Sequence, residues 1–162
     1  GPEGIGCIVG DRETIGRINQ LNYSGGSQVQ GYEAMDALRS LVYAPLMLAL
    51  QKEVGNELVD RLNNGEVEGI ESALIANAQS RVILVRFKEP IAKKVLENAN
   101  KLGAAPYPIG AESKYEVCPM FYRVSGTFLI DNPELEDYMI RINPMRGGAN
   151  TIIRVLQEAI DC

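Results

Sequence analysis

The sequence predicts an α/β chain that ends in a small α+β domain, where a short sheet is covered by helices on one face. Two observations lead to this prediction. From about residue 66 onward, short β-branched runs and helical stripes follow one another in the order strand, strand, helix, strand, strand, helix. Before that point, a Gly-spaced apolar segment leads into a long helical pattern. We therefore predict two units, residues 1–64 and 65–162.

The first unit is expected to open with a strand and a short helix. Gly4–Val9 is apolar and Gly-spaced, which is typical of a short buried strand, so we expect Cys7 in the core. Asp11 is a suitable N-cap for a helix that carries Ile15 and Ile18 on one face.

A longer helical pattern follows a Gly/Ser loop and runs from about Tyr32 to Leu62. Pro45 is expected to kink or break this helix, because proline lacks the N–H and crowds the preceding turn. Asn63-Asn64-Gly65 should end it.

The second unit carries the clearer alternation of strands and helices. Its expected strands are Ile70–Ala76, Arg81–Phe87, Met120–Ile130 with a turn or bulge at Gly126, and Tyr138–Asn143. Its expected helices begin near Pro90, with Ile91, Val95, Leu96, Ala99 and Leu102 on one stripe, and near Ala149, ending near Ile160.

Composition excludes several classes of function. The 162 residues carry a net charge of -5 without a Lys/Arg cluster, which disfavours nucleic-acid binding. No apolar run is long enough to span a bilayer, so no membrane partner is expected. The chain has no histidine, which removes the commonest general base and metal ligand, and no metal site is evident. Three widely spaced cysteines indicate a reducing, cytoplasmic location.

Three motifs stand out. The opening Gly1-Pro2-Glu3-Gly4-Ile5-Gly6 permits tight turning and close backbone approach, although a plain Gly-rich strand would look the same. Ser24-Gly25-Gly26-Ser27 precedes the long helix, where free N–H groups can bind an anion or simply form an N-cap. In Ile140-Arg141-Ile142-Asn143, Arg141 faces away from two apolar neighbours and can offer a bidentate fork to a carboxylate, or make a surface ion pair.

In this order, the segments resemble the C-terminal portion of fold-type I pyridoxal-phosphate-dependent enzymes, of the class V aminotransferase-like and selenocysteine-synthase-like kind. The opening resembles the run that follows the cofactor lysine in that family, with matches at Gly1, Pro2, Gly4, Gly6, Ile8 and Gly10. The resemblance implies that residues 1–64 are the end of the cofactor-binding large domain with its connecting helix. It implies that residues 65–162 are the small C-terminal domain.

The resemblance also implies a cofactor, pyridoxal 5'-phosphate, and an amino-acid substrate that reacts by transamination, elimination or replacement, as in a transferase or lyase. Gly26 and Ser27 would contact the cofactor phosphate, and Arg141 would hold the substrate carboxylate. The Schiff-base lysine would precede Gly1, so no catalytic residue is assigned and this chain alone is expected to be inactive. The expected partner is a second subunit in a homodimer, or the remainder of the same enzyme.

Two other functions stay open at this stage. The absence of histidine and of a paired catalytic constellation also fits a non-enzymatic α+β interaction or regulatory domain. Cys118 precedes an expected strand, roughly where the resembled cysteine desulfurases carry their nucleophile. A packed thiol is the ordinary alternative for Cys118, and Cys162 is expected to be free and incidental.

Overall fold

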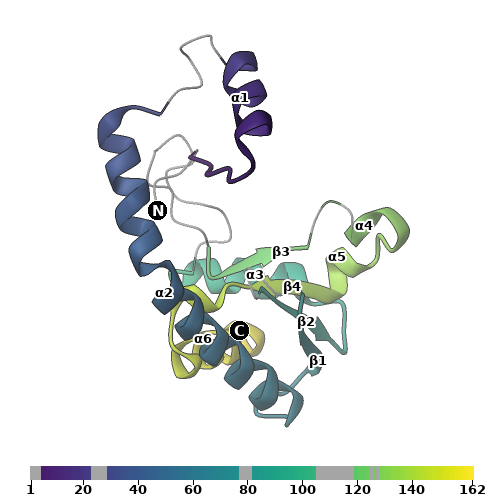
Figure 1. Ribbon diagram of the computed structural model, residues 1–162. Coiled ribbons are helices and arrows are strands. Elements are labelled where there is room, and N and C mark those ends of the chain that lie inside the picture. The colour runs from purple at the N-terminus through teal and green to yellow at the C-terminus, as the bar shows by residue number, and fades with distance from the viewer. Residues whose placement is uncertain (1–4, 23–28, 77–81, 105–118, 125, 127) are drawn as a thin grey trace.

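The structure is a computed structural model that describes residues 5–22, 29–76, 82–104, 119–124, 126 and 128–162 (Figure 1). Within these ranges the chain forms four strands and several helices around one small sheet. The strands are β1 (Ile70–Ile75), β2 (Ile83–Phe87), β3 (Phe121–Arg123) and β4 (Met139–Ile142). The α-helices are α1 (Arg12–Leu21), α2 (Gly31–Asn63), α3 (Ala92–Lys101), α4 (Phe128–Asp131), α5 (Leu135–Tyr138) and α6 (Ala149–Asp161).

The sheet is antiparallel throughout and has the strand order β1-β2-β4-β3. The last strand in the sequence therefore lies between β2 and β3, not at an edge. Helix α3 links β2 to the edge strand β3, and α6 follows β4. This arrangement confirms the predicted α+β fold class.

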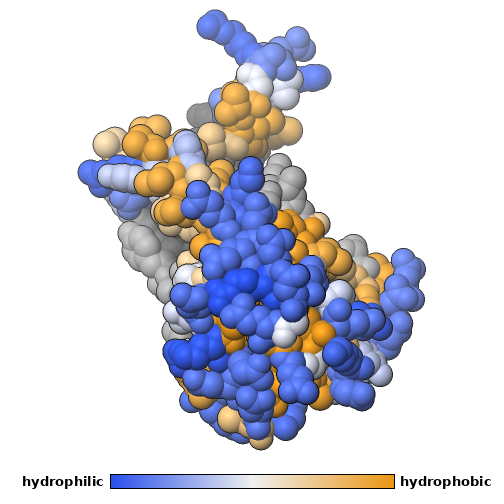
Figure 2. All heavy atoms as spheres, turned by 90° about the horizontal axis from the view of Figure 1, so that it is seen from below, coloured by the Kyte–Doolittle hydropathy of each residue, from blue (hydrophilic) through white to orange (hydrophobic). Residues whose placement is uncertain are grey.

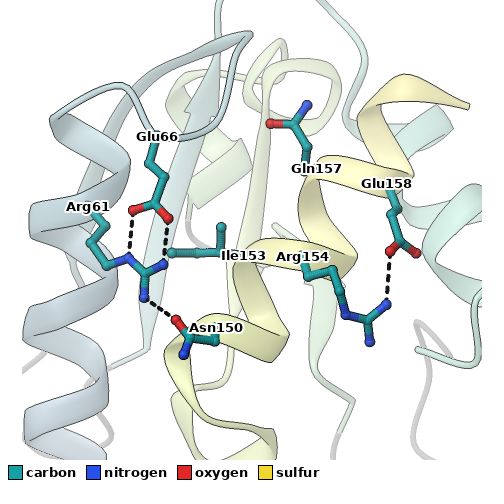
Figure 3. Close-up of a pocket in the computed structure, with 7 residues that line it drawn as sticks. All are labelled: Arg61, Glu66, Asn150, Ile153, Arg154, Gln157 and Glu158. Carbon is teal, nitrogen blue, oxygen red and sulfur yellow. Dashed lines mark hydrogen bonds and ion pairs between the residues drawn. The ribbon is translucent and has the colours of Figure 1, made fainter.

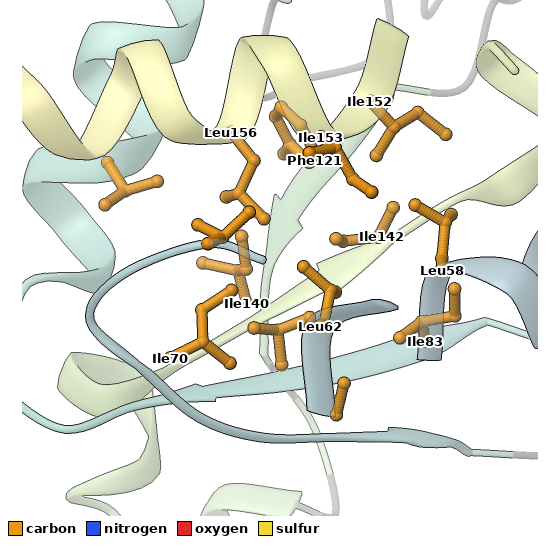
Figure 4. Close-up of a cluster of buried hydrophobic side chains, with 14 of the residues drawn as sticks. Leu58, Leu62, Ile70, Ile83, Phe121, Ile140, Ile142, Ile152, Ile153 and Leu156 are labelled. Atoms are coloured by element: carbon orange, nitrogen blue, oxygen red, sulfur yellow. The ribbon is translucent and has the colours of Figure 1, made fainter. Parts of the chain in front are cut away.

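The main core lies between one face of the sheet and the helices α3, α6 and the last turns of α2 (Figure 4). Ile140 and Ile142 point into this core from β4, which confirms the predicted alternation of that strand. Leu58 and Leu62 enter it from α2, so the end of the long helix packs as part of the sheet unit. Burial of such side chains is the main favourable contribution to folding.

The start of the chain departs from the prediction. Residues 5–11 form no regular secondary structure, and the expected strand at Gly4–Val9 is therefore wrong over its described part. Val9 is 91% exposed and Ile8 is 65% exposed, and Cys7 is exposed too, so the prediction that Cys7 lies in the core is also wrong. A strand needs a neighbour for its backbone groups, and none of the four described strands pairs with this segment.

Both predicted helices of the first unit are present. The Asp11 carboxylate accepts a hydrogen bond from the Thr14 N–H at 2.8 Å, which confirms the predicted N-cap of α1. Helix α2 starts with a capping box in which Glu33 accepts from the Gln30 N–H at 3.0 Å. It then continues through Pro45, so of the predicted kink or break the break is absent, because a proline removes only one of the many hydrogen bonds of a long helix.

The end of α2 is tied to the sheet by the side chain of Asn63, which makes the two backbone hydrogen bonds that a neighbouring strand would make. The Asn63 amide donates to the Ala73 C=O at 2.9 Å and accepts from the Ala73 N–H at 2.8 Å. These bonds satisfy backbone groups on the outer side of the edge strand β1. Gly65 then turns the chain with φ of 82°, a conformation that glycine adopts without a Cβ clash.

All four strands are shorter than predicted, and the difference is largest for β3. Met120–Ile130 contributes only β3, because Gly126 takes φ of 64° and residues from Phe128 onward turn into the short helix α4. Tyr138 belongs to α5, and β4 begins one residue later. Helix α6 confirms the predicted last helix.

Seen from below, most of the surface is hydrophilic, with hydrophobic atoms gathered toward the upper part of the view (Figure 2). Among the described helices, none has the length and hydrophobicity that crossing a bilayer requires.

Candidate functional site

The predicted site residue Arg141 lies on the sheet face that points away from the main core. Strand pairing places it in one cross-strand row with Leu74 on β1, Leu84 on β2 and Tyr122 on β3. Residues directly opposite one another in an antiparallel pair share a face, so the four side chains lie on one face and Leu84 and Tyr122 flank Arg141. The alternation of β4 puts Ile140 and Ile142 in the core and Arg141 on this second face, as predicted.

The contacts that orient the Arg141 guanidinium include a hydrogen bond and a cation–π stack. Its Nε donates a hydrogen bond to the Arg123 backbone carbonyl at 2.9 Å. Its central carbon lies 4.2 Å from the centroid of the Tyr122 ring, which is a close cation–π stack. The side chain is half-buried, so the strand, the ring and the carbonyl together restrict its rotation. A guanidinium fixed in this way is suited to bind a planar carboxylate.

A second arginine, Arg86, lies on the same face of the sheet. Arg86 pairs in register with Met139, and its Nε lies 2.8 Å from Oε2 of Glu71. Its guanidinium also lies 5.4 Å from the Tyr138 ring centroid. Because Glu71 compensates its charge, Arg86 serves to hold β1, β2 and α5 together.

The structure also has a shallow pocket between the end of α2 and α6 (Figure 3). Most of its polar side chains are hydrogen-bonded to one another, and Gln157 donates to Asp161 at 2.9 Å. Arg61 binds both carboxylate oxygens of Glu66, with the Nε–Oε2 pair at 2.6 Å, and donates to Asn150 at 2.8 Å and to Glu57 at 2.7 Å. Arg154 is paired with Glu158 at 2.9 Å.

These pairs shift the ionisation of the groups that form them. The hydrogen bond from Arg61 lowers the pKa of Glu66 and, in return, raises the pKa of Arg61. Both groups therefore stay charged at neutral pH and exchange no proton there. The pocket is best explained as an ion-paired joint between α2 and α6, without a catalytic constellation.

Lys93 also forms ion pairs that connect two helices. Its ammonium lies 2.8 Å from the Asp137 carboxylate and 3.7 Å from Glu136, which ties α3 to α5. The hydrogen bond with Asp137 raises the pKa of Lys93, so this lysine stays protonated and is unsuited to act as a nucleophile.

Several sequence-predicted residues cannot be placed. Gly26, Ser27 and Cys118 lie outside the described residues. Among the described residues, no group of three or more Cys, Asp or Glu side chains is arranged to hold a metal ion. Cys7 and Cys162 are free and exposed.

Sequence reasoning missed the partners of Arg141. Tyr122 was not recognised because its role depends on the register between β3 and β4, which are separated in the sequence by residues 124–138 with the two short helices α4 and α5. The available signal was the Tyr122-Arg123 dipeptide at the start of a predicted strand, which is weak without the pairing.

Comparison with known proteins identifies the family. Residues 56–156 match the family model described as YhfS-like, C-terminal domain. The chain belongs to this family. It is 56% identical over 160 residues to the uncharacterized protein YhfS of Escherichia coli (strain K12), covering 99% of this chain and 44% of that protein.

A solved structure agrees with this assignment. The crystal structure of the pyridoxal-5'-phosphate dependent protein YhfS from Escherichia coli matches with a TM-score of 0.86 and 55% identity. The match covers 99% of this chain and 45% of that one. The chain thus spans less than half the length of these relatives.

Proposed function

We propose that this chain supplies the C-terminal part of a pyridoxal-phosphate-dependent enzyme of fold type I, of the class V aminotransferase-like or selenocysteine-synthase-like kind. The observation that carries the proposal is the 55% identity to a YhfS structure described as pyridoxal-5'-phosphate dependent. When bound, this cofactor acts as an electron sink for reactions at the α-carbon of amino acids. The proposed reaction is a transamination, elimination or replacement on an amino acid.

The role we propose for Arg141 is to bind the substrate carboxylate. Arginine offers two parallel N–H donors to a carboxylate, which fixes both its position and its orientation. The contacts of Arg141 with Arg123 and Tyr122 support this role, since they hold the guanidinium before any ligand arrives. The chain's own contribution is then to bind and orient the substrate.

The other roles fall on parts of the protein that the structure does not describe. We propose that Gly26 and Ser27 contact the cofactor phosphate and that the Schiff-base lysine belongs to the sequence ahead of Gly1. We further propose a homodimer in which each active site lies at the subunit interface.

The cofactor proposal can be tested with a joined polypeptide, in which the part of Escherichia coli YhfS outside the matched region is placed ahead of this chain. The purified protein should show the visible absorbance of bound pyridoxal phosphate, and one or more amino acids should shift that band. A folded joined polypeptide without cofactor absorbance after incubation with pyridoxal phosphate would end the proposal.

Arg141 is tested in the same protein by Arg141→Ala. We expect the KM for the responding amino acid to rise by roughly 10- to 160-fold, which corresponds to about 1.5–3 kcal/mol for a charged hydrogen bond. Arg154→Ala is the matched control, because Arg154 is an exposed arginine on the outer side of α6. An unchanged kcat/KM in Arg141→Ala would exclude the carboxylate role while leaving the cofactor proposal intact.

A further inference from the structure

Exposed and buried apolar side chains are divided sharply along this chain. Among the described residues, fourteen of the eighteen exposed large hydrophobic side chains precede Gln51. All twenty-three buried hydrophobic residues follow it. The division falls inside a single continuous helix, since α2 extends from Gly31 to Asn63 and only its last turns reach the sheet (Figure 1).

The exposed half of α2 contains ten successive residues without a charged side chain, Leu41–Leu50, which we call the α2 patch. Successive helical residues point about 100° apart, so Leu46, Met47 and Leu48 face three different sides. Their exposed fractions are 59%, 41% and 51%. A helix that is apolar on every side is normally buried on every side, so an occupant of the α2 patch has to surround it.

The accessible surface area of the chain is larger than that of a compact monomer of the same mass. The chain exposes 10429 Å², whereas a compact monomer of 17.7 kDa exposes about 7,950 Å². The excess, about 2,500 Å², belongs to the whole chain, and the exposed side chains of α2 contribute to it. A seam between two helices covers only one apolar stripe of each, and would leave the other sides of the α2 patch in water.

We infer that the α2 patch is the docking surface for the other part of a YhfS-like polypeptide, which encloses this half of the helix. The structural boundary between the two parts then lies within α2 near Gln51. The matched family is described as a C-terminal domain, and its match begins at residue 56, close to where burial begins. More than half of each YhfS relative lies outside the match, which provides a partner of sufficient size. The inference rests on the exposed apolar side chains of α2 and on the length of the YhfS relatives, and it does not depend on the cofactor.

Two native methionines report on this surface. Met35 is 50% exposed and Met47, within the α2 patch, is 41% exposed, and they lie on different sides of α2. Mild peroxide oxidation, read by mass spectrometry, should modify both in the 162-residue chain. In the joined polypeptide their oxidation should slow by about tenfold or more, because oxidation of methionine requires access of the reagent. The exposed Cys162 should react with a thiol reagent equally in both proteins.

A matched pair of variants separates specific docking from general compaction. Leu46→Glu introduces a charge into the α2 patch and should remove the protection of Met35 and Met47 in the joined polypeptide. Ile130→Glu introduces the same charge on α4, where Ile130 is 74% exposed, and should leave the protection in place. Protection that survives Leu46→Glu would overturn the inference.

The other occupants give different outcomes. If the 162-residue chain alone elutes as a dimer with both methionines already protected, the occupant is a second copy and the inference fails. It also fails if phosphatidylcholine vesicles protect the methionines of the 162-residue chain while the joined polypeptide leaves them open. Equal, rapid oxidation in both proteins would show a solvated helix and would overturn the inference as well.

A second measurement removes any dependence on the folding of the joined polypeptide. Hydrogen exchange can be compared between intact Escherichia coli YhfS and this chain, over the segment of YhfS that aligns with residues 41–50. We expect exchange to be about 100-fold slower in intact YhfS, because a helix inside an interface opens far less often than one in water. Equal exchange rates would contradict the inference.

Discussion

Leu46 and Leu58 lie on the same helix but in opposite surroundings, which makes them a direct test of where the core begins. Leu58 is 0% exposed and packs on the sheet, whereas Leu46 is 59% exposed. Changing either residue to alanine removes the same isopropyl group from a helix interior. Differences in helix propensity therefore cancel, and only the loss of packing separates the two variants.

Leu58→Ala should lower the free energy of unfolding by about 2–5 kcal/mol, the range for leucine truncation in a packed core. For a chain of this size, that loss corresponds to a fall in Tm of about 4–20 °C. Leu46→Ala in the same 162-residue chain should change stability by no more than about 0.5 kcal/mol, as expected for an exposed position.

Urea unfolding followed by far-ultraviolet circular dichroism measures both variants, and a shift in midpoint at constant m-value reports stability alone. The measurement should be repeated at several protein concentrations, since association through the α2 patch would make the midpoint depend on concentration. Equal losses for the two variants would refute the division of α2 into a core half and an interface half.

Two further predictions concern the joints between α2 and the rest of the fold. Asn63→Ala should lower the free energy of unfolding by about 1–3 kcal/mol, because the N–H and C=O of Ala73 both lose their partner. Asn63→Asp should give an intermediate loss, because aspartate keeps only the acceptor. A urea midpoint of Asn63→Ala equal to the parent's would reject this prediction. The pKa of Glu66 is lowered by Arg61, so the stabilisation from this pair is present above the ordinary carboxyl pKa of about 4.3 and is lost as the pH falls through the folded pKa. Between about pH 7 and pH 3, the Tm of Glu66→Gln should therefore fall less than the parent's, and parallel curves would contradict the assignment.

Where a segment has a clear periodicity and one face buried in the described core, the sequence was a good guide. The apolar stripe of α6 contains Ile152, Val155 and Leu156, and all three are buried as expected. The alternation in β4 placed Ile140 and Ile142 on one side and Arg141 on the other, which holds because β4 lies inside the sheet and has a buried face.

Where a segment depends on partners elsewhere, the sequence was misleading. Ile8 and Val9 have strand-forming side chains, yet no described strand is available to pair with them, and they remain exposed. Phe128 and Ile130 also suit a strand, but the turn at Gly126 directs the chain into α4. Local preference is a weak constraint when the decisive contact is not in the segment itself.

The same reasoning explains why Arg141 could be singled out while its setting could not. Its position opposite two apolar residues is a local property of the strand, and this is visible in the sequence. Its orientation depends on Tyr122 and on the Arg123 carbonyl, which only the antiparallel pairing of β3 with β4 brings alongside. An arginine that is already held by its neighbours loses less rotamer freedom when a carboxylate binds, and this lowers the cost of binding. The sheet register therefore makes Arg141 better suited to hold a carboxylate than an equally exposed arginine on a helix.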